Sequence, residues 1–492
     1  MAAVLAASFL AAPAAAAGEP APVPGDERAV TRHLAHGDIA AGDPDMEAVL
    51  AHGRMLFEAR FTVEDGAGRP AATAAEIPTR RRTGDQPLYL RTSGPDATAC
   101  AGCHNQPDTG GAGDFVANAF VAPQDIEWDF ESVTPDLSME RGTTHMFGSG
   151  LLELVAREMT ADLHALRAEA LAEARATGAP ASRDLVTKGV DFGTITATPD
   201  GYVDVGAVEG VHPDLIVKPF GQKASSISLR RFTVTAYNSH HGMQPVERFG
   251  ARWTGTDDFD EDGRTAELTE GDITAAVLWQ ASLPPPGRTA PDHPVLREAA
   301  RRGEAVFAEI GCASCHRPTL PLDSLVFTEP GSFNPAGTLR AGEAAPVSLD
   351  LAGRFEGLLE RDAEGRWLVP AFTDLKRHVI ADAEDAFFAN ELITQDFVPR
   401  DRFRTAPLWG VGSTAPYGHR GDLTTLAGSI GHHAGDARPA REAFEALSDA
   451  DRGALIEFLE TLTIDPAAGA GSGGPAAAPV EVTPRRQAAA RP

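Results

Sequence analysis

The chain of 492 residues has few cysteines, few basic residues and no long hydrophobic run. No apolar stretch reaches the roughly 20 residues that a membrane-spanning helix needs, so the sequence excludes a transmembrane segment. There are 43 Lys and Arg residues against 70 Asp and Glu, which gives a net charge of −27 at pH 7. Nucleic acids and anionic membranes would repel such a chain, whereas a basic partner protein would be attracted to it.

All four cysteines lie in two short runs, Cys100-Ala-Gly-Cys103-His104 and Cys312-Ala-Ser-Cys315-His316. This spacing is typical of covalent haem c attachment, because two thiols three positions apart reach the two vinyl groups of one porphyrin. Zinc would require Cys-x-x-Cys pairs that converge, and a redox dithiol does not call for a following histidine. The runs therefore predict two covalently bound haem c groups, with His104 and His316 as the proximal iron ligands.

The two ends of the chain differ in composition from the rest. Residues 1–17 are alanine-rich and apolar and end in small residues, which predicts a signal peptide. No Lys or Arg precedes the apolar core of this segment. Residues 18–44 predict a flexible leader, and residues 466–492 predict a disordered tail. Because haem is attached to such motifs outside the bacterial cytoplasm, we expect an exported, periplasmic protein.

Helical spacing of apolar residues predicts helices over residues 46–59, 151–173, 271–281 and 294–307. The run Ser448-Asp-Ala-Asp451 begins a further helix as a variant of the capping box. Short strands are expected within residues 195–208.

The prolines between Leu283 and Gly287 predict a linker that divides the chain into two halves. In the second half, one helix on each side of the Cys-x-x-Cys-His run resembles a class I cytochrome c domain. We therefore expect a mainly α fold with two cytochrome c-like haem domains, short strands and long irregular loops. The N-terminal haem c domain, with insertions, would cover residues 45–285 and the C-terminal one residues 286–465.

The stretch from Arg404 to Gly421, followed by Ser429 to Asp436, resembles the C-terminal signature of the di-haem oxidoreductase family. That family is also called thiol oxidoreductase and is distantly related to the bacterial di-haem cytochrome c peroxidases. Further matching segments are Cys103–Gly111, Phe147–Glu153, Phe220–Ala224, Leu229–Phe232 and Asp374–His378. One departure follows His378, where Val-Ile-Ala replaces the family's Asp-Met-Gly, so any role of that methionine is absent.

The resemblance also implies distal iron ligands. His433 falls where the peroxidases hold the sixth ligand of the haem that receives electrons, which implies a His/His pair at the C-terminal iron, of lower potential than His/Met. Neighbouring His432 is the alternative, and surface roles for both residues are the third interpretation.

At the N-terminal iron the sequence offers several distal candidates, namely His145, Met146, His240, His241 and Met243. A methionine commonly occupies the position of His241 in the family, and histidine also ligates iron. The resemblance therefore favours His241, with His145 as the nearest alternative.

Other residues are weaker candidates for function. His419 matches a family position close to the haems, where it would hydrogen-bond a propionate or assist catalysis, and His378 is similar. Glu153 could deliver a proton to the leaving oxygen of a peroxide, although a helix-end charge is the simpler interpretation. Trp128, Trp279 and Trp409 are candidates for an electron relay, although each is explained as well by packing.

An acidic run, Asp258, Asp260 and Asp262 followed by Gly263, matches the first half of an EF-hand calcium loop. The second half fails, because the twelfth position is Thr269 and Glu270 comes one place late. A calcium site and a solvated acidic turn are both open interpretations.

Together these features predict a periplasmic di-haem c-type oxidoreductase that is peroxidase-like. One haem would receive electrons, from a basic donor protein, and the other would act on a small oxidant such as hydrogen peroxide. The alternative is a non-catalytic electron-transfer cytochrome in which both irons carry two protein ligands. A third interpretation is oxidation of an organic or protein substrate.

Overall fold

A computed structural model describes residues 24–68, 77–78, 98–121, 138–392 and 394–464 of the chain. The described part of the chain is mixed α/β, with 37% helix and 17% strand in several small sheets. The expected mainly α fold with cytochrome c-like domains is therefore wrong. The expected signal peptide, the tail over residues 466–492 and Trp128 all lie outside the described residues.

The helices expected from the sequence are found as α2, α4, α8, α9 and α12. Each of α2, α8 and α12 begins with a polar side chain that accepts a hydrogen bond from the first turn, as the capping rule requires. The α-helices are α1 (His36–Ala41), α2 (Met46–Glu58), α3 (Cys100–Cys103), α4 (Ser149–Thr177), α5 (Leu229–His241), α6 (Val246–Phe249), α7 (Ala251–Thr254), α8 (Glu270–Ala281), α9 (Pro294–Glu309), α10 (Leu426–Gly431), α11 (Arg438–Glu445) and α12 (Asp449–Glu460).

The strands form small antiparallel sheets, and most of them are too short to show an alternating pattern in the sequence. Three of the sheets are the ribbon β1 (Gly113–Val121) with β2 (Ser138–Thr143), the sheet β3 (Ala181–Thr187), β4 (Val190–Ala197) and β5 (Val203–Val208), and the pair β6 (Gly287–Arg288) with β14 (Leu462–Thr463). The others are β7 (Leu320–Leu322) with β10 (Glu360–Arg361) and β11 (Trp367–Val369), β8 (Val326–Glu329) with β9 (Val347–Asp350), and β12 (Arg377–Val379) with β13 (Arg402–Arg404). The segment between α9 and α10, where we expected loops, is thus rich in strand pairs.

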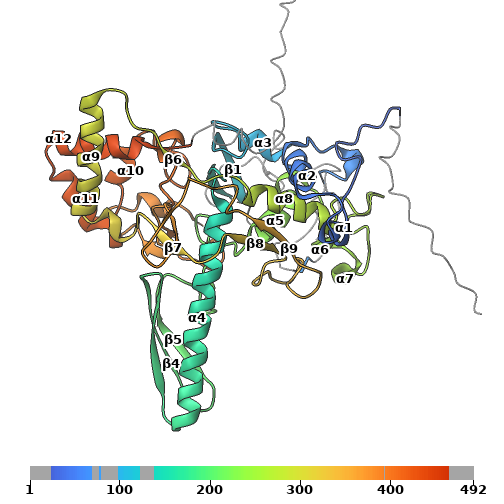
Figure 1. Ribbon diagram of the computed structural model, residues 1–492, viewed down its shortest axis with the longest axis horizontal. Helices are drawn as coiled ribbons and strands as arrows, with labels where there is room; N and C mark the ends of the chain where they lie inside the picture. Colours follow the sequence, from blue (N-terminus) through green and yellow to red (C-terminus); the bar gives the residue numbers. More distant parts are fainter. Residues whose placement is uncertain (1–23, 69–76, 79–97, 122–137, 393, 465–492) are drawn as a thin grey trace, which may run out of the picture.

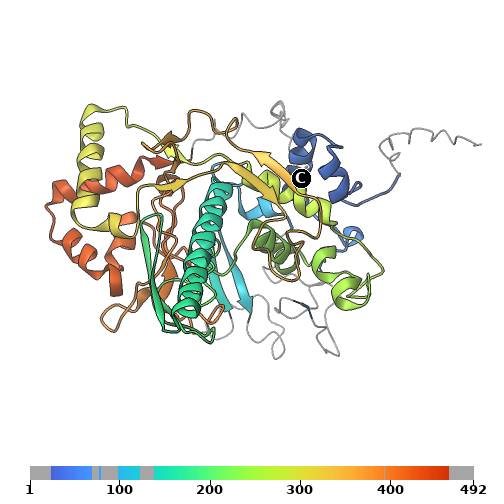
Figure 2. The same ribbon diagram turned by 60° about the horizontal axis from the view of Figure 1, so that its bottom comes forward.

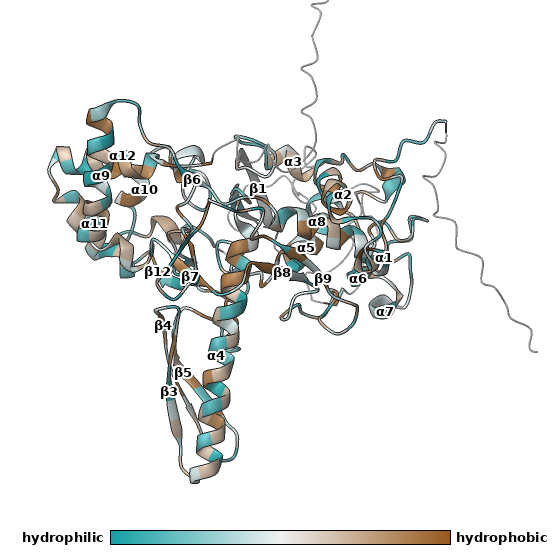
Figure 3. Ribbon diagram, in the orientation of Figure 1, coloured by the Kyte–Doolittle hydropathy of each residue, from teal (hydrophilic) through white to brown (hydrophobic). Residues whose placement is uncertain are grey.

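The described elements form a body with one projecting arm. Helices α9 to α12 gather at one end of the body, and α1, α2 and α5 to α8 gather at the other (Figures 1 and 2). The arm consists of the long helix α4 with β3, β4 and β5 lying along it (Figure 1). Hydrophobic residues are concentrated in α8 and in the part of α4 next to the body (Figure 3). The first Cys-x-x-Cys-His run lies at the α8 end and the second lies at the α9 end.

Two hydrophobic clusters accompany these two ends. The larger contains residues of α2, α4, α5 and α8 and also strand residues from β7, β8 and β9. The smaller lies between α9 and α12 and includes Phe307, Phe372 and Phe458, whose rings contact one another edge to face. The proline-rich stretch ends α8 at Ala281, as expected, but its residues are buried.

A close helix contact at Gly303 holds the second cluster together. A Cβ added to Gly303 in α9 would lie 1.9 Å from the carbonyl oxygen of Ala454 in α12. We expect Gly303→Ala to lower the free energy of unfolding by about 1–3 kcal/mol, because the helices must separate. Gly453→Ala, on α12 with nothing within 4 Å, is the matched control and should instead stabilise the protein by about 0.5–1 kcal/mol. Urea denaturation of both variants measures the change in the free energy of unfolding. Equal changes in the two variants would contradict the prediction.

The chain before α1 is fastened to α8 by the buried carboxylate of Asp272. Asp272 accepts hydrogen bonds from His33 Nδ1 at 2.6 Å, from His52 Nε2 at 2.8 Å and from the Leu34 amide at 3.0 Å. Burial opposes its charge, but the two histidines outweigh that effect and hold the pKa of Asp272 far below its usual range. The same hydrogen bond raises the pKa of His33.

These shifts predict a pH window for the contribution of Asp272 to stability. The carboxylate contributes fully above its unfolded pKa of about 3.9 and loses that contribution as the pH falls toward its folded pKa. The His33 contribution is complete below about pH 6.5 and is lost as the pH rises through the raised pKa of His33. We expect Asp272→Asn to cost about 1.5–3 kcal/mol near pH 5 and to flatten both slopes.

The control for Asp272 is Asp451→Asn. Asp451 holds the same third position of α12, but its side chain is 31% exposed. Its substitution should cost less than about 1 kcal/mol, as for exposed ion pairs. Thermal unfolding between about pH 2 and pH 8 compares the two variants, and an unchanged pH profile of Asp272→Asn would refute the prediction.

Candidate functional site

A small cavity adjoins the first Cys-x-x-Cys-His run. One wall carries Cys100, Cys103 and His104, and the other is a face of α5. The α5 residues on the wall recur at helical spacing and are Phe232, Thr233, Ala236, Tyr237, His240 and His241.

The imidazole of His104 is half-buried and fixed by a backbone contact. Its Nδ1 donates to the Gly111 carbonyl at 3.3 Å, and the ring of Phe57 lies 6.1 Å away between centroids. Burial lowers the pKa of His104, so the ring is neutral. A neutral imidazole with one nitrogen held by a carbonyl is the form in which histidine ligates metals.

Three of the distal candidates line the cavity, and they are His240 and His241 in α5 and Met146 before α4. Burial lowers the pKa of His240 to about 3, so this ring is neutral too. His241 Nε2 lies 3.4 Å from Cys100 Sγ across the cavity. The other two candidates, His145 and Met243, do not line this cavity.

Polar groups that the sequence did not single out also line the cavity. Gln280 in α8 donates from Nε2 to Thr233 Oγ1 at 2.9 Å. Thr143, at the end of β2, also lines the cavity. Tyr237 is buried, and burial holds the pKa of its phenol well above the usual range. The cavity thus combines apolar walls with a few hydrogen-bonding groups.

The second Cys-x-x-Cys-His run has a similarly held histidine. His316 Nδ1 donates to the Phe372 carbonyl at 3.1 Å. Burial, together with the nearby ring of His433, lowers the pKa of His316 to about 4. His433 is half-buried and donates from Nδ1 to the Ser429 carbonyl at 2.8 Å. The structure therefore brings His316 and His433 together.

Neighbouring His432 has a different environment. Its ring stacks on Phe387 with 4.0 Å between centroids, and its Nδ1 lies 3.1 Å from an oxygen of Asp385. Its side chain is 37% exposed. Of the two adjacent histidines, His433 is the one that faces the second Cys-x-x-Cys-His run.

His378 lies close to Cys315. Its Nε2 is 2.7 Å from Asp374 Oδ2, and ligand atoms of Cys315, Asp374 and His378 all lie within 4.8 Å of one another. Burial opposes a charge on His378, but interactions with Asp374 and Cys315 outweigh it and raise the pKa to about 10. His378 therefore differs from the neutral His104 and His316.

His419 is buried among aromatic rings and cations. It packs on Phe403 at 4.6 Å between centroids, and its Nε2 is 3.0 Å from Asn390 Oδ1. Burial, reinforced by Arg141, Lys223 and Arg420, lowers its pKa to about 2, so the ring stays neutral.

Glu153 does not line the cavity. It is fully buried in α4, accepts from the Leu229 amide at 2.7 Å and pairs with Arg157 at 2.6 Å. Burial raises its pKa to about 7. Trp279 packs on Phe57 with 4.6 Å between ring centroids, and Trp409 is buried beside Gly148.

The acidic loop places three carboxylates together. Oxygen atoms of Asp258, Asp260 and Asp262 lie within 4.8 Å of one another. Glu267 is buried nearby, and burial holds its pKa well above the usual range. The calcium site stays a prediction.

Among the described residues, no helix combines the length and the apolar character that crossing a membrane requires.

Solved structures give only distant likenesses. Hydrazine synthase from Kuenenia stuttgartiensis, pressurised with 20 bar xenon, is 13% identical, with 90% of this chain and 100% of that chain covered and a TM-score of 0.34. A MauG-like protein associated with microbial copper homeostasis is 17% identical, with a TM-score of 0.23. The match covers 51% of this chain and 71% of that chain. Such TM-scores are too low to bear on fold or function.

A search of curated proteins found no match. The profile of a family described as "Di-haem oxidoreductase, putative peroxidase" matches residues 368–462. This segment contains His378, His419 and His433 but neither Cys-x-x-Cys-His run. The match confirms the resemblance that the C-terminal motifs indicated. The likeness to the di-haem oxidoreductase family is thus found over residues 368–462.

Proposed function

We propose that this chain is an exported oxidoreductase that carries two covalently attached haem c groups and reduces a small oxidant such as hydrogen peroxide. The observation that carries the proposal is shared by both Cys-x-x-Cys-His runs. In each, a half-buried neutral histidine donates from Nδ1 to a backbone carbonyl, of Gly111 for His104 and of Phe372 for His316. This arrangement would present Nε2 to an iron.

The residues fit haem better than zinc. Cys100 packs against the larger hydrophobic cluster and Cys312 against the smaller one, so the two cysteine pairs do not converge on one ion. The cavity beside Cys100 also has mainly apolar walls, including Phe57, Ala99 and Phe232. Cys100, Cys103 and His104 would hold the first haem, and Cys312, Cys315 and His316 the second.

The two sites suit different tasks. His433 beside His316 would close the second iron with two histidines, which suits a centre that only receives and passes electrons. At the first site, Thr143, Thr233 and Gln280 line an open space in which they would orient a small polar oxidant. His241 would be the distal ligand there, and it would have to leave if peroxide is to bind. When bound, haem supplies one-electron redox chemistry and an iron that can take a substrate oxygen.

Protons and partners extend the proposal. Neither Glu153 nor His419 lines the cavity beside His104. Their role as proton carriers therefore rests on the sequence alone. The large negative charge of the chain would favour a basic electron-donor protein. Export to the periplasm follows from the attachment chemistry and from the expected signal over residues 1–17.

Optical and EPR spectra of the haem-loaded protein, oxidised and half-reduced, test the proposal. We expect a high-spin signal from the first site, at once or after one electron is added, and its loss on addition of peroxide. A protein with two low-spin bis-histidine irons in every redox state would instead be the non-catalytic electron-transfer cytochrome. A protein without covalent haem would overturn both functions.

A further inference from the structure

A continuous path of hydrogen bonds and covalent bonds joins the imidazoles of the two proximal histidines. At the first site, His104 Nδ1 donates to the Gly111 carbonyl at 3.3 Å, and the adjoining Gly110 carbonyl accepts from the Met146 amide at 2.7 Å. At the second, His316 Nδ1 donates to the Phe372 carbonyl, and the adjoining Ala371 carbonyl accepts from the Leu408 amide at 3.1 Å.

A single side chain joins these two halves of the path. His145, next to Met146, lies with Nε2 at 2.9 Å from the carbonyl oxygen of Trp409, which is next to Leu408. Apart from the hydrogen bonds that the two proximal rings themselves donate, every other step runs along backbone or through a backbone hydrogen bond. The contact between His145 and Trp409 is therefore the step that a side-chain substitution can break.

The surroundings of His145 fix this contact. Burial lowers the pKa of His145 to about 4, so the ring is neutral and carries one proton. Because a carbonyl oxygen only accepts, that proton must sit on Nε2. A Cβ on Gly410 would come within 3.1 Å of Nε2, and a Cβ on Gly148 within 2.5 Å of the Trp409 indole. Two glycines thus allow the imidazole and the indole to approach the backbone.

We propose that His145 is a positioning residue for electron transfer between the two haems, through its hydrogen bond to the Trp409 carbonyl. Electron tunnelling decays less steeply along bonds and hydrogen bonds than across gaps, so a complete path gives the stronger coupling. In each transfer one electron, supplied by a one-electron donor, leaves the iron at His316 and reduces the iron at His104. No bond forms or breaks, and no proton moves. This inference rests on the proposed function.

Electron transfer along this route requires the imidazole of His145 but not the indole of Trp409. His145→Phe removes the donor, whereas Trp409→Phe keeps the carbonyl and removes only the indole. His145→Gln restores an N–H donor on a side chain of similar reach. Each variant is loaded with haem, and one electron is delivered by pulse radiolysis while the absorbance of both haems is followed.

We expect His145→Phe to slow the transfer roughly tenfold or more, equivalent to about 1.4 kcal/mol in the barrier. His145→Gln should recover much of the rate, and Trp409→Phe should stay near the wild-type rate. Midpoint potentials and EPR spectra should be unchanged in all three variants. A change in iron ligation or in folding would alter them, so these measurements separate such a change from a slower transfer. Should His145→Phe fail to load two haems, His145→Leu replaces it.

A wild-type rate in His145→Phe or His145→Leu would overturn the inference. So would a Trp409→Phe variant as slow as His145→Phe, since the indole would then carry the electron. Both outcomes leave the proposed function standing, because the wild type still holds two haems and passes electrons between them. A wild-type protein that binds no haem would overturn the proposed function, and this inference with it.

Discussion

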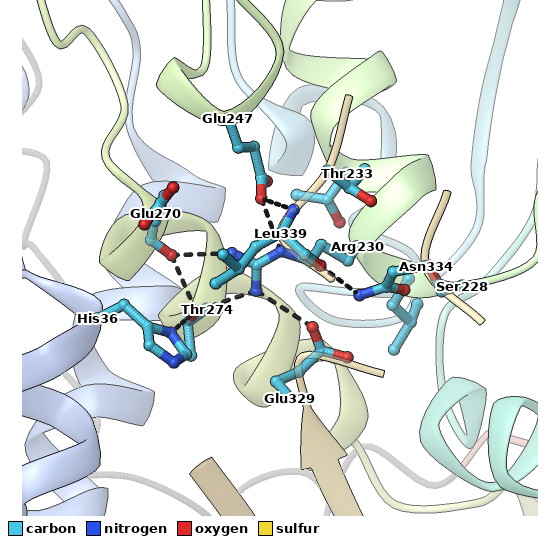
Figure 4. Close-up of polar contacts among 12 residues, drawn as sticks. His36, Ser228, Arg230, Thr233, Glu247, Glu270, Thr274, Glu329, Asn334 and Leu339 are labelled. Carbon is cyan, nitrogen blue, oxygen red and sulfur yellow. Dashed lines mark hydrogen bonds and ion pairs between the residues drawn. The ribbon is translucent and has the colours of Figure 1, made fainter. Parts of the chain in front are cut away.

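Replacing Arg230 by methionine should lower the free energy of unfolding by about 3–5 kcal/mol, the usual cost of removing one partner from a buried ion pair. Arg230 is fully buried in α5 and pairs with Glu247 at 2.8 Å and with Glu329 at 3.1 Å. It also donates to Thr274 Oγ1 and to the Glu270 carbonyl, both at 3.0 Å (Figure 4). Methionine fills much of the same space but leaves two buried carboxylates without this cation.

Arg231→Met is the matched control for Arg230→Met. The two arginines are adjacent in α5, but Arg231 is only partly buried and donates to Thr235 one turn away in the same helix. Its substitution should change stability by less than about 1 kcal/mol. Guanidinium denaturation of both variants measures the difference. Similar losses in the two would show that the network around Arg230 adds little to stability.

Replacing His433 by methionine should raise the midpoint potential of the second haem by on the order of 0.1 V, a fraction of the 0.8 V range that axial ligands control. The reason is that a thioether stabilises reduced iron relative to an imidazole. His433 is the histidine whose charge would act on His316, so it is the residue expected to complete that coordination. A potentiometric titration followed at each haem measures the shift.

His432→Met provides the comparison one residue away. Because His432 stacks on Phe387 and contacts Asp385 at the surface, its substitution should leave both potentials unchanged. A shift in His432→Met instead of His433→Met would identify His432 as the ligand. If neither variant shifts a potential, both histidines have surface roles and the second iron has another partner.

The helices could be predicted from the sequence, whereas the sheets could not. The apolar spacing in α2, α9 and α12 repeats over several turns, and polar caps mark where α2 and α12 begin. Strands such as β7 and β12 have three residues each, which is too short for an alternating pattern to stand out. For this reason the fold was expected to be mainly α and is mixed.

The candidate site could be predicted only as far as its motifs reach. The Cys-x-x-Cys-His runs indicate the attachment residues directly, and the family segments point to His241 and His433. Contacts between distant segments leave no local signal, so the pairing of Gln280 with Thr233 was not expected. The sequence also cannot tell Arg230 from Arg231, or His432 from His433, because burial distinguishes the members of each pair.

The arm formed by α4 and its sheet should unfold in two steps when followed by hydrogen exchange. Nearly all buried residues of α4 lie between Ser149 and Leu163, and beyond them only Ala170 and Ala174 are buried. The outer turns therefore rest on β3 and β4 alone, and opening them would not disturb the body. Amides of the outer turns should exchange through local openings, whereas those near Leu151 should exchange only when the whole protein unfolds. The far end of the arm is thus a site at which a probe or an inserted peptide could be accommodated without loss of the body's cooperativity.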